Sequence, residues 1–229
     1  MTRGPHRASR RRARTAAGVS WCGRHRAVDA DPGTPAQAPG EGGGSPPVLR
    51  RLVAGHVPVD SREAAAKERF LVELDRLGRP TDEAADPVHV TASAIVVGPR
   101  GTVLHRHRKL GRWMQPGGHL DSGEPPAAAA LREAHEETGL DLSHPPGGPA
   151  FIHLDVHPAA GGHTHLDLRY LLVGADEDPR PFPGESPEAR WYGWDEAEVI
   201  ADEALIGALR VARGAWVRLS EGSGSGVAG

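Results

Sequence analysis

One segment, residues 118–140, constrains this chain more than any other. It reads GHLDSGEPPAAAALREAHEETGL. Five residues separate Gly118 from Glu124, and seven more separate Glu124 from the charged run that begins at Arg132. Glycine and proline before this run and glycine after it mark a turn, a helix start and a helix end at fixed offsets. The segment therefore predicts a loop joined rigidly to a charged helix.

The residues around this run predict a helix over 127–138. Pro125 and Pro126 fit the first turn, where a missing N–H group costs nothing. Gly139 is the expected C′ residue. Small residues recur at helical spacing and form one face that would pack closely on a sheet. These residues are Ala127, Ala130, Leu131, Ala134 and Thr138.

Three carboxylates project from another face of this helix, since Glu133, Glu136 and Glu137 stand at i, i+3 and i+4. Their mutual repulsion is relieved only in part by Arg132, which faces Glu136. Mg²⁺ and Mn²⁺ prefer such oxygen ligands. A cation of this kind can neutralise a diphosphate and lower the pKa of an attacking water. The alternative is a solvated acidic helix face.

The whole segment resembles the signature of the Nudix hydrolase family, G-x5-E-x7-R-E-U-x-E-E-x-G-U, where U is aliphatic. Every fixed position matches; Ala134 stands where a larger aliphatic residue is more usual. The resemblance implies an α/β fold, a Nudix-like α/β/α sandwich with a mixed β-sheet. It also implies Mg²⁺ (or Mn²⁺) as the cofactor and a small-molecule nucleotide-type substrate, and it makes a homodimer one expected assembly.

The resemblance implies roles residue by residue. Glu136 and Glu137 would bind metal together with the carbonyl of Gly117 and with Glu133, which would also orient or deprotonate the water. Arg132 and Glu124 would join loop and helix through a salt bridge. Gly117 and Gly118 permit the sharp turn that points a carbonyl at the metal.

The chain divides into four predicted parts. Residues 1–47 read as a disordered basic arm with a Gly/Pro linker, and residues 48–87 as a helical extension. In that extension Asp60 and Glu63 form a capping box, and the helix ends at Gly78. Residues 88–219 form the Nudix domain and residues 220–229 a flexible tail.

Charge and cysteine content limit the functional classes. Residues 1–50 hold nine arginines and three acidic residues, a charge of +6, whereas the remainder carries −9. An acidic domain argues against general nucleic-acid binding. Cys22 is the only cysteine, which excludes an intrachain disulfide. Without a membrane-length apolar run or a convincing secretory signal, we expect a cytoplasmic protein.

Two strands, 88–97 and 102–107, precede the metal loop. Basic residues and a tryptophan follow them and could bind substrate phosphates and stack on a base. The alternative is a solvated hairpin edge with the tryptophan in the core. The candidates for substrate binding are Arg106, Lys109, Arg112 and Trp113.

Residues 151–157 and 163–170 alternate with period two and predict a hairpin. A symmetric loop would place Asp155 opposite His165 and His153 opposite Asp167. Ile152, Leu154 and Val156 would then share the face of Leu166, Leu168 and Tyr170. The opposite, polar face has three interpretations: a substrate cleft, a second metal site or a wet sheet surface. For the cleft, the named residues are Asp155, His165, Asp167 and Arg169.

An acidic loop precedes the expected last strand and resembles the Nudix loop that often supplies another metal ligand or the catalytic base. Glu185 is the first candidate for that role and Glu188 the second; a plain surface loop is the alternative. Asp195 is expected to cap a final helix over 196–213, with Val199 on its apolar side.

Together these features predict a pyrophosphohydrolase that cleaves a diphosphate linkage in a nucleoside diphosphate joined to another moiety. Three alternatives stay open to different degrees. A sensor would keep the fold but usually lose the box glutamates. An isopentenyl-diphosphate isomerase would need a catalytic cysteine. RNA cap removal fits the basic arm but not the acidic domain.

Overall fold

Strand β1 (Val88–Gly98) is the centre of a mixed sheet. Its β-branched and small residues suit a strand that is covered on both faces. The computed structural model describes residues 43–108 and 110–224, which belong to one compact unit, Ala36–Gly229. In the sheet path β3-β2-β1-β7-β5, β1 runs parallel to β7; β4, β6 and β8 pair with β1, β7 and β2.

The remaining strands are short except for the hairpin formed by β6 and β7. Their bounds are β2 Gly101–Arg106, β3 Trp113–Met114, β4 Gly117–His119, β5 Leu142–Ser143, β6 Ala150–Pro158, β7 Thr164–Gly174 and β8 Ala189–Tyr192. The helices are α1 Pro46–Gly55, α2 Ser61–Arg76, α3 Pro126–Thr138, α4 Trp194–Ile200 and α5 Glu203–Gly224, with a 3-10 turn, η1, at Ala160–Gly162.

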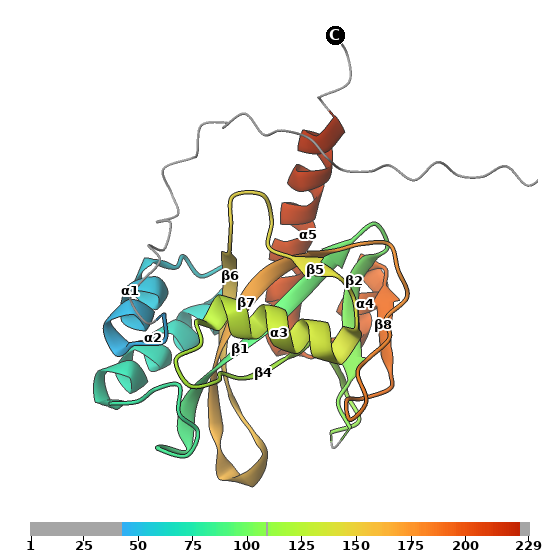
Figure 1. Cartoon of the computed structure of the whole chain (residues 1–229). Coiled ribbons are helices and arrows are strands. Elements are labelled where there is room, and N and C mark those ends of the chain that lie inside the picture. Colours follow the sequence, from blue (N-terminus) through green and yellow to red (C-terminus); the bar gives the residue numbers. More distant parts are fainter. Residues whose placement is uncertain (1–42, 109, 225–229) are drawn as a thin grey trace, which may run out of the picture. The chain divides into compact units, whose positions relative to one another are not determined.

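Helices cover both faces of this sheet (Figure 1). On one face, Ala92 and Ala94 of β1 belong to the same buried cluster as Ala130 and Ala134 of α3. On the other, Ile95 and Val97 belong to a cluster with Leu205 and Leu209 of α5. The predicted α/β/α sandwich with a mixed sheet is confirmed.

The predicted pairing within the hairpin is wrong by two residues. Asp155 lies opposite Asp167, and His157 lies opposite His165. The connection is centred on Gly161, whose φ of +74° suits glycine, so the turn closes one residue later than a symmetric loop would. A β-bulge between Phe151 and His153 also turns Ile152 away from the face of Leu154.

The N-terminal extension forms two helices rather than one. The predicted capping box of α2 forms in half. The Asp60 carboxylate accepts a hydrogen bond from Glu63 N at 2.8 Å, but the Glu63 carboxylate accepts from Val59 N rather than from Asp60 N. Helix α2 ends at Arg76, close to the predicted end, and packs on β6 through contacts that include Phe70 and Leu74 of the core.

The C-terminal helix differs from the prediction. Asp195 lies inside the first turn of α4, whose N-cap is Gly193, and a break at 201–202 separates α4 from α5. Val199 is 83% exposed rather than apolar-packed, because the short α4 presents this position to solvent. Helix α5 continues to Gly224, within the tail that the sequence predicts to be flexible.

The predicted basic arm lies outside the described residues, as do Cys22 and most of the linker. Among the residues that the structure does describe, no helix is both long and apolar enough to cross a membrane.

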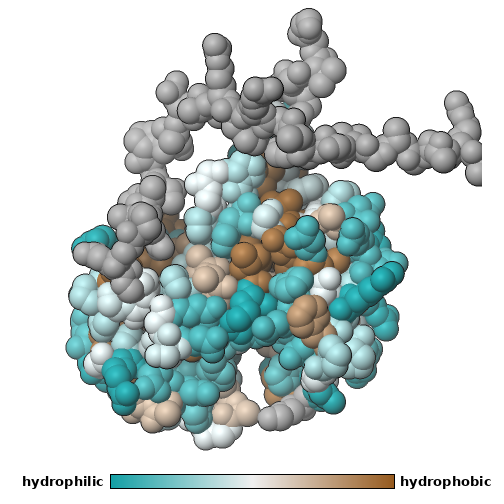
Figure 2. Space-filling model, viewed as in Figure 1, coloured by the Kyte–Doolittle hydropathy of each residue, from teal (hydrophilic) through white to brown (hydrophobic). Residues whose placement is uncertain are grey.

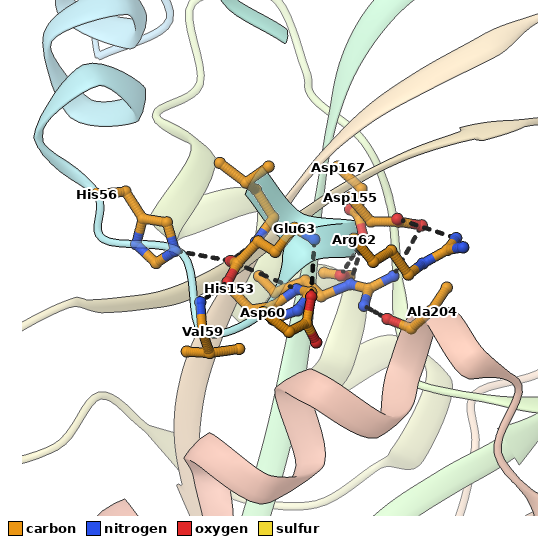
Figure 3. Close-up of polar contacts among 12 residues, drawn as sticks. His56, Val59, Asp60, Arg62, Glu63, His153, Asp155, Asp167 and Ala204 are labelled. Carbon is orange, nitrogen blue, oxygen red and sulfur yellow. Dashed lines mark hydrogen bonds and ion pairs between the residues drawn. The ribbon is translucent and has the colours of Figure 1, made fainter. Parts of the chain in front are cut away.

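A carboxylate is buried where α2 meets β6 (Figure 3). Glu63 is 1% exposed and accepts hydrogen bonds from Val59 N at 2.7 Å, Leu154 N at 2.9 Å and His56 Nε2 at 2.6 Å. Burial alone would raise the pKa of Glu63, but these donors lower it. A buried carboxylate with three donors fixes the position of α2 on the sheet.

A second buried group joins β6 and β7 beside it. Arg169 donates to Asp167 at 3.1 Å and Asp155 at 3.4 Å, and it also bonds the carbonyl of Ala204 in α5 (Figure 3). Burial would raise the pKa of Asp155, but the hydrogen bond from His157 and the charge of Arg169 lower it to about 2. The polar face of the hairpin is therefore largely an internal ion network.

His153 makes the stability of this region depend on pH. Burial and the charge of Arg169 lower its pKa to about 4, below the unfolded value near 6.5. The unfolded chain binds this proton first, so the free energy of unfolding falls as the pH drops from about 6.5 to about 4. The slope for this one group is at most about 1.4 kcal/mol per pH unit.

Urea unfolding between pH 7 and pH 4.5 measures this slope. His153→Asn should flatten it relative to the native chain, while Val199→Ala, at an exposed position with no titrating group, should leave it unchanged. Equal slopes in all three proteins would contradict the assignment.

Candidate active site

Arg132 joins the loop of residues 117–124 to helix α3. Its guanidinium donates to both oxygens of Glu124 at 3.0 and 2.9 Å and to the carbonyl of His119 at 3.0 Å. It also donates to Glu133 at 2.7 Å. Burial would raise the pKa of Glu124, but the hydrogen bonds and charge of Arg132 lower it. The geometry is that of the predicted salt bridge between Arg132 and Glu124.

Two glycines bring the loop against the carboxylates. Gly117 N donates to Glu137 at 2.8 Å, and a Cβ on Gly117 would lie 2.3 Å from Ser93 Cβ. A Cβ on Gly118 would lie 2.6 Å from the carboxyl carbon of Glu133. Only glycine lets β4 pass between β1 and the helix at this distance.

The carboxylates crowd together at this loop. Burial, together with the charges of Glu133, Glu185 and Glu136, raises the pKa of Glu137 to about 8. Burial and the charges of Glu136 and Glu185 also raise the pKa of Glu133, against the opposing effect of Arg132. Like charges that raise one another's pKa in this way form a site that a cation would stabilise.

The acidic loop 176–188 lies across the C-terminal end of α3. Phe182 N donates to the carbonyl of Glu136 at 2.9 Å, and Arg180 N donates to that of Thr138 at 2.6 Å. This places the charge of Glu185 close enough to affect Glu133 and Glu137. Glu188 instead pairs with Arg106 at 3.1 Å and Arg190 at 3.5 Å. The two candidates therefore occupy different surroundings.

The predicted basic cluster is spread along the surface near this loop. Arg106 pairs with Glu188, and Arg112 lies 3.7 Å from Asp202. Trp113 is partly buried, with Tyr192 at 5.2 Å between ring centroids and the guanidinium of Arg190 over its ring at 5.3 Å. Lys109 lies outside the described residues. Their contact with substrate stays a prediction.

The residues predicted to line a cleft are divided between two places. Asp155, Asp167 and Arg169 are each 2–3% exposed and belong to the ion network. Asp167 also accepts hydrogen bonds from Ser93 at 2.8 Å and Gln115 at 3.3 Å, next to the metal loop. His165 lies apart from them, among other histidines. Their contact with substrate also stays a prediction.

Three histidines near the site were not predicted as site residues. His105 of β2 lies 3.5 Å from Glu137, and burial lowers its pKa to about 4. His89 and His119 lie 3.1 Å apart between their Nε2 atoms. Two signals were available in the sequence. His119 directly follows Gly118, and His89 alternates along its strand with the same face as Thr91 and Ser93.

Helix α3 presents a hydrophilic outer surface, and the face of the molecule is notched below it (Figure 2). The notch lies between the β6–β7 hairpin and the segment around β3 (Figures 1 and 2). The adjacent loop and helix offer carboxylate and carbonyl oxygens as metal ligands, and a hard divalent cation prefers oxygen ligands. The residues present therefore fit Mg²⁺ or Mn²⁺.

A mixed sheet between helices, with this loop and carboxylate-bearing helix at its centre, defines a Nudix-type domain. The family model described as NUDIX domain matches residues 87–211, more than half of the chain. The chain belongs to the Nudix family, as the pattern in residues 118–140 predicts.

Individual relatives are more distant. The chain is 34% identical over 116 residues to an isopentenyl-diphosphate Delta-isomerase of Streptomyces griseus. The matched region covers 46% of this chain and 57% of that protein. It is 38% identical over 99 residues to a CMP-5'-(N-acetyl-N-hydroxy-3-aminopropyl)phosphonate hydrolase of Streptomyces rubellomurinus, covering 42% and 46%. The chain thus spans about half the length of these curated relatives.

Among solved structures, a Nudix-family hydrolase from Clostridium perfringens is 27% identical. The similarity covers 57% of this chain and 97% of that one, with a TM-score of 0.48.

The two loop glycines should differ in their tolerance of a side chain. Gly117→Ala places a Cβ against the backbone of β1, so we expect it to lower the free energy of unfolding by about 2 kcal/mol or more. Gly118→Ala meets the movable end of Glu133 and should cost about 1 kcal/mol.

Urea unfolding of both variants tests this order. Gly193→Ala is the control, because φ there is −60° and no atom lies within 4 Å of an added Cβ. Equal losses at Gly117 and Gly193 would contradict the close approach of β4 to β1.

Proposed function

We propose that this protein is a Mg²⁺- or Mn²⁺-dependent pyrophosphohydrolase. Its substrate would be a nucleoside diphosphate joined to another moiety, cleaved at the diphosphate linkage by water attack at phosphorus. One observation carries the proposal: the carboxylates of Glu137 and Glu133 meet at the glycine-rich loop, where Gly117 N donates to Glu137 at 2.8 Å and Glu133 lies against Gly118. Nothing in a stable helix requires that concentration of negative charge.

The chain's own residues would act in three ways. Glu136, Glu137, Glu185 and the carbonyl of Gly117 would hold the cation, which when bound neutralises the diphosphate and acidifies water. Glu133 would orient the water and accept its proton, since its carboxylate lies at Gly118 with a raised pKa. Arg132 and Glu124 would keep loop and helix in register.

Basic side chains outside the box would bind the substrate phosphates. The side chains of Arg106, beside Glu188, and Arg112, beside Asp202, are about half exposed or more, so an incoming anion could reach their guanidinium groups. We retain Lys109 and Trp113 as further candidates on sequence grounds. A cytoplasmic location and a homodimer stay predictions that no observation on this chain supports.

An isomerase is the second candidate because two relatives carry that name. An isomerase on this fold uses a catalytic cysteine, whereas residues 87–211 contain none. The phosphonate hydrolase among the relatives agrees better with the chemistry of the cluster. A sensor that binds but does not cleave is the third candidate, and the complete set of box glutamates argues against it.

Glu137→Gln should lower kcat at least about 100-fold, because it removes one charge from the proposed cation site while keeping the side-chain volume. Chromatographic separation of the products formed from ADP-ribose, dinucleoside polyphosphates, nucleoside triphosphates and sugar nucleotides, with Mg²⁺, Mn²⁺ or chelator, measures the loss.

Glu196→Gln, on the exposed first turn of α4, is the matched control and should keep full activity. Metal-dependent turnover that survives Glu137→Gln would sink the proposal. Binding of one compound without turnover would favour the sensor.

Substitutions of Glu133 and Glu185 should differ in their effects on kcat and on Mn²⁺ affinity. Glu133→Gln should lower kcat about 100-fold or more while Mn²⁺ affinity stays within a few-fold, as expected for the base. Glu185→Gln should weaken Mn²⁺ binding, followed by electron paramagnetic resonance, in addition to lowering kcat. The reverse pattern would assign the base to Glu185.

A further inference from the structure

The polar face of the sheet ends in a cluster of histidines away from the ion network. The face is continuous across four strands. His119 of β4 lies opposite Thr91 of β1, and His89 of β1 lies opposite His165 of β7. His165 in turn lies opposite His157 of β6. Side chains opposite one another on neighbouring strands lie on the same side of a sheet. Histidines from β1, β4 and β7 are therefore brought together by pairing alone.

Three of these side chains converge on one point. His89, His119 and His165 each offer a ring nitrogen, and these nitrogens all lie within 4.8 Å of one another. The Nε2 atoms of His89 and His119 are 3.1 Å apart. Three nitrogens bound to one tetrahedral ion at 2.0–2.1 Å would be about 3.3 Å apart, so the cluster is close to the required spacing.

At His89 the hydrogen bond directs a lone pair to this point. The Nδ1 of fully buried His89 lies 3.1 Å from the carbonyl of Asp86, an acceptor, so Nδ1 carries the proton and Nε2 the lone pair. A metal-bound histidine typically donates its other N–H to a carbonyl in this way. His119 Nε2 lies 3.2 Å from the carboxylate of Glu83, so without an ion it carries a proton, which an incoming ion would displace.

The cluster is open on one side. The side chain of His119 is 43% exposed and that of Glu83 is 54% exposed, whereas His89 is buried. The rings of His163 and His157 lie 5.2 Å from His89 and 5.5 Å from His165. An ion could therefore enter from solvent and keep a coordination position for Glu83, water or another ligand.

We propose that His89, His119 and His165 form a second metal site, for a borderline divalent ion of the Zn²⁺ class. Imidazole nitrogen suits Zn²⁺ and similar transition metals, whereas Mg²⁺ prefers the oxygen ligands of the Glu133–Glu137 cluster. The two sites are thus separated by ligand type. An ion here would tie β4 to β1 and β7 through His119, two residues from Gly117. This inference does not rest on the proposed hydrolase activity.

Zinc binding to the full-length chain tests the site. The chain is freed of metal by chelator and titrated with Zn²⁺ in excess Mg²⁺, which occupies the carboxylate cluster. We expect one Zn²⁺ per chain after gel filtration, a higher thermal unfolding temperature, and intense visible absorption when Co²⁺ replaces Zn²⁺. Binding should weaken at least tenfold in His119→Gln and in His165→Gln.

Three variants act as controls and should retain zinc: His135→Gln on the exposed side of α3, Glu137→Gln in the carboxylate cluster, and Cys22→Ser. Circular dichroism of the metal-free variants tests whether they fold. Because the side chain of His119 is nearly half exposed, its substitution should disturb packing least. Zinc that persists in His119→Gln and His165→Gln, is lost in Glu137→Gln or Cys22→Ser, or never binds the native chain would overturn the proposal.

Discussion

The carboxylate cluster depends on the guanidinium of Arg132. Without a cation at that position, Glu124, Glu133 and Glu136 would repel one another across the junction of loop and helix. Arg132 contacts all three and also bonds the carbonyl of His119, so it compensates charge and fixes backbone with one planar group. Among the described residues, Arg132 forms no hydrogen bond or ion pair with Glu137, which accepts from Gly117 N and lies 3.5 Å from His105. Burial and the neighbouring carboxylates raise the pKa of Glu137 to about 8, and a divalent ion would stabilise its ionised form.

Strand β1 links this cluster to the rest of the molecule because its two faces have different compositions. One face carries Ala92 and Ala94, whose small side chains let α3 approach the sheet closely. The other face carries His89, Thr91 and Ser93, which share the polar face with β7. The short β4 pairs with β1 at Ser93 and Thr91, so the glycine loop belongs to both. A single strand therefore positions the carboxylates and the histidines.

Features set by neighbours in the sequence could be predicted, and those set by distant pairings could not. The helix over 127–138, its Gly139 end and the Asp60 cap follow from local spacing, and the structure has them. The hairpin register failed because it depends on the conformation of one glycine, Gly161, and on a bulge that alternation does not reveal. The break between α4 and α5 was missed although its signal is local. Asp202, whose carboxylate accepts from Leu205 N at 3.2 Å, starts a new helix within an otherwise helical pattern.

The polar face of the hairpin could not be resolved from sequence because its members differ in what surrounds them. Asp155 and Asp167 lie on either side of Arg169, and Thr91, Ser93 and Gln115 supply further donors, so that part of the face is saturated internally. At the other end, His89, His119 and His165 bring ring nitrogens together with a single carboxylate, Glu83, at their edge. Alternation of polar and apolar residues is the same along both ends of β7. Burial with complementary partners makes one end structural, and convergence of ring nitrogens on an open edge gives the other end the character of a ligand site.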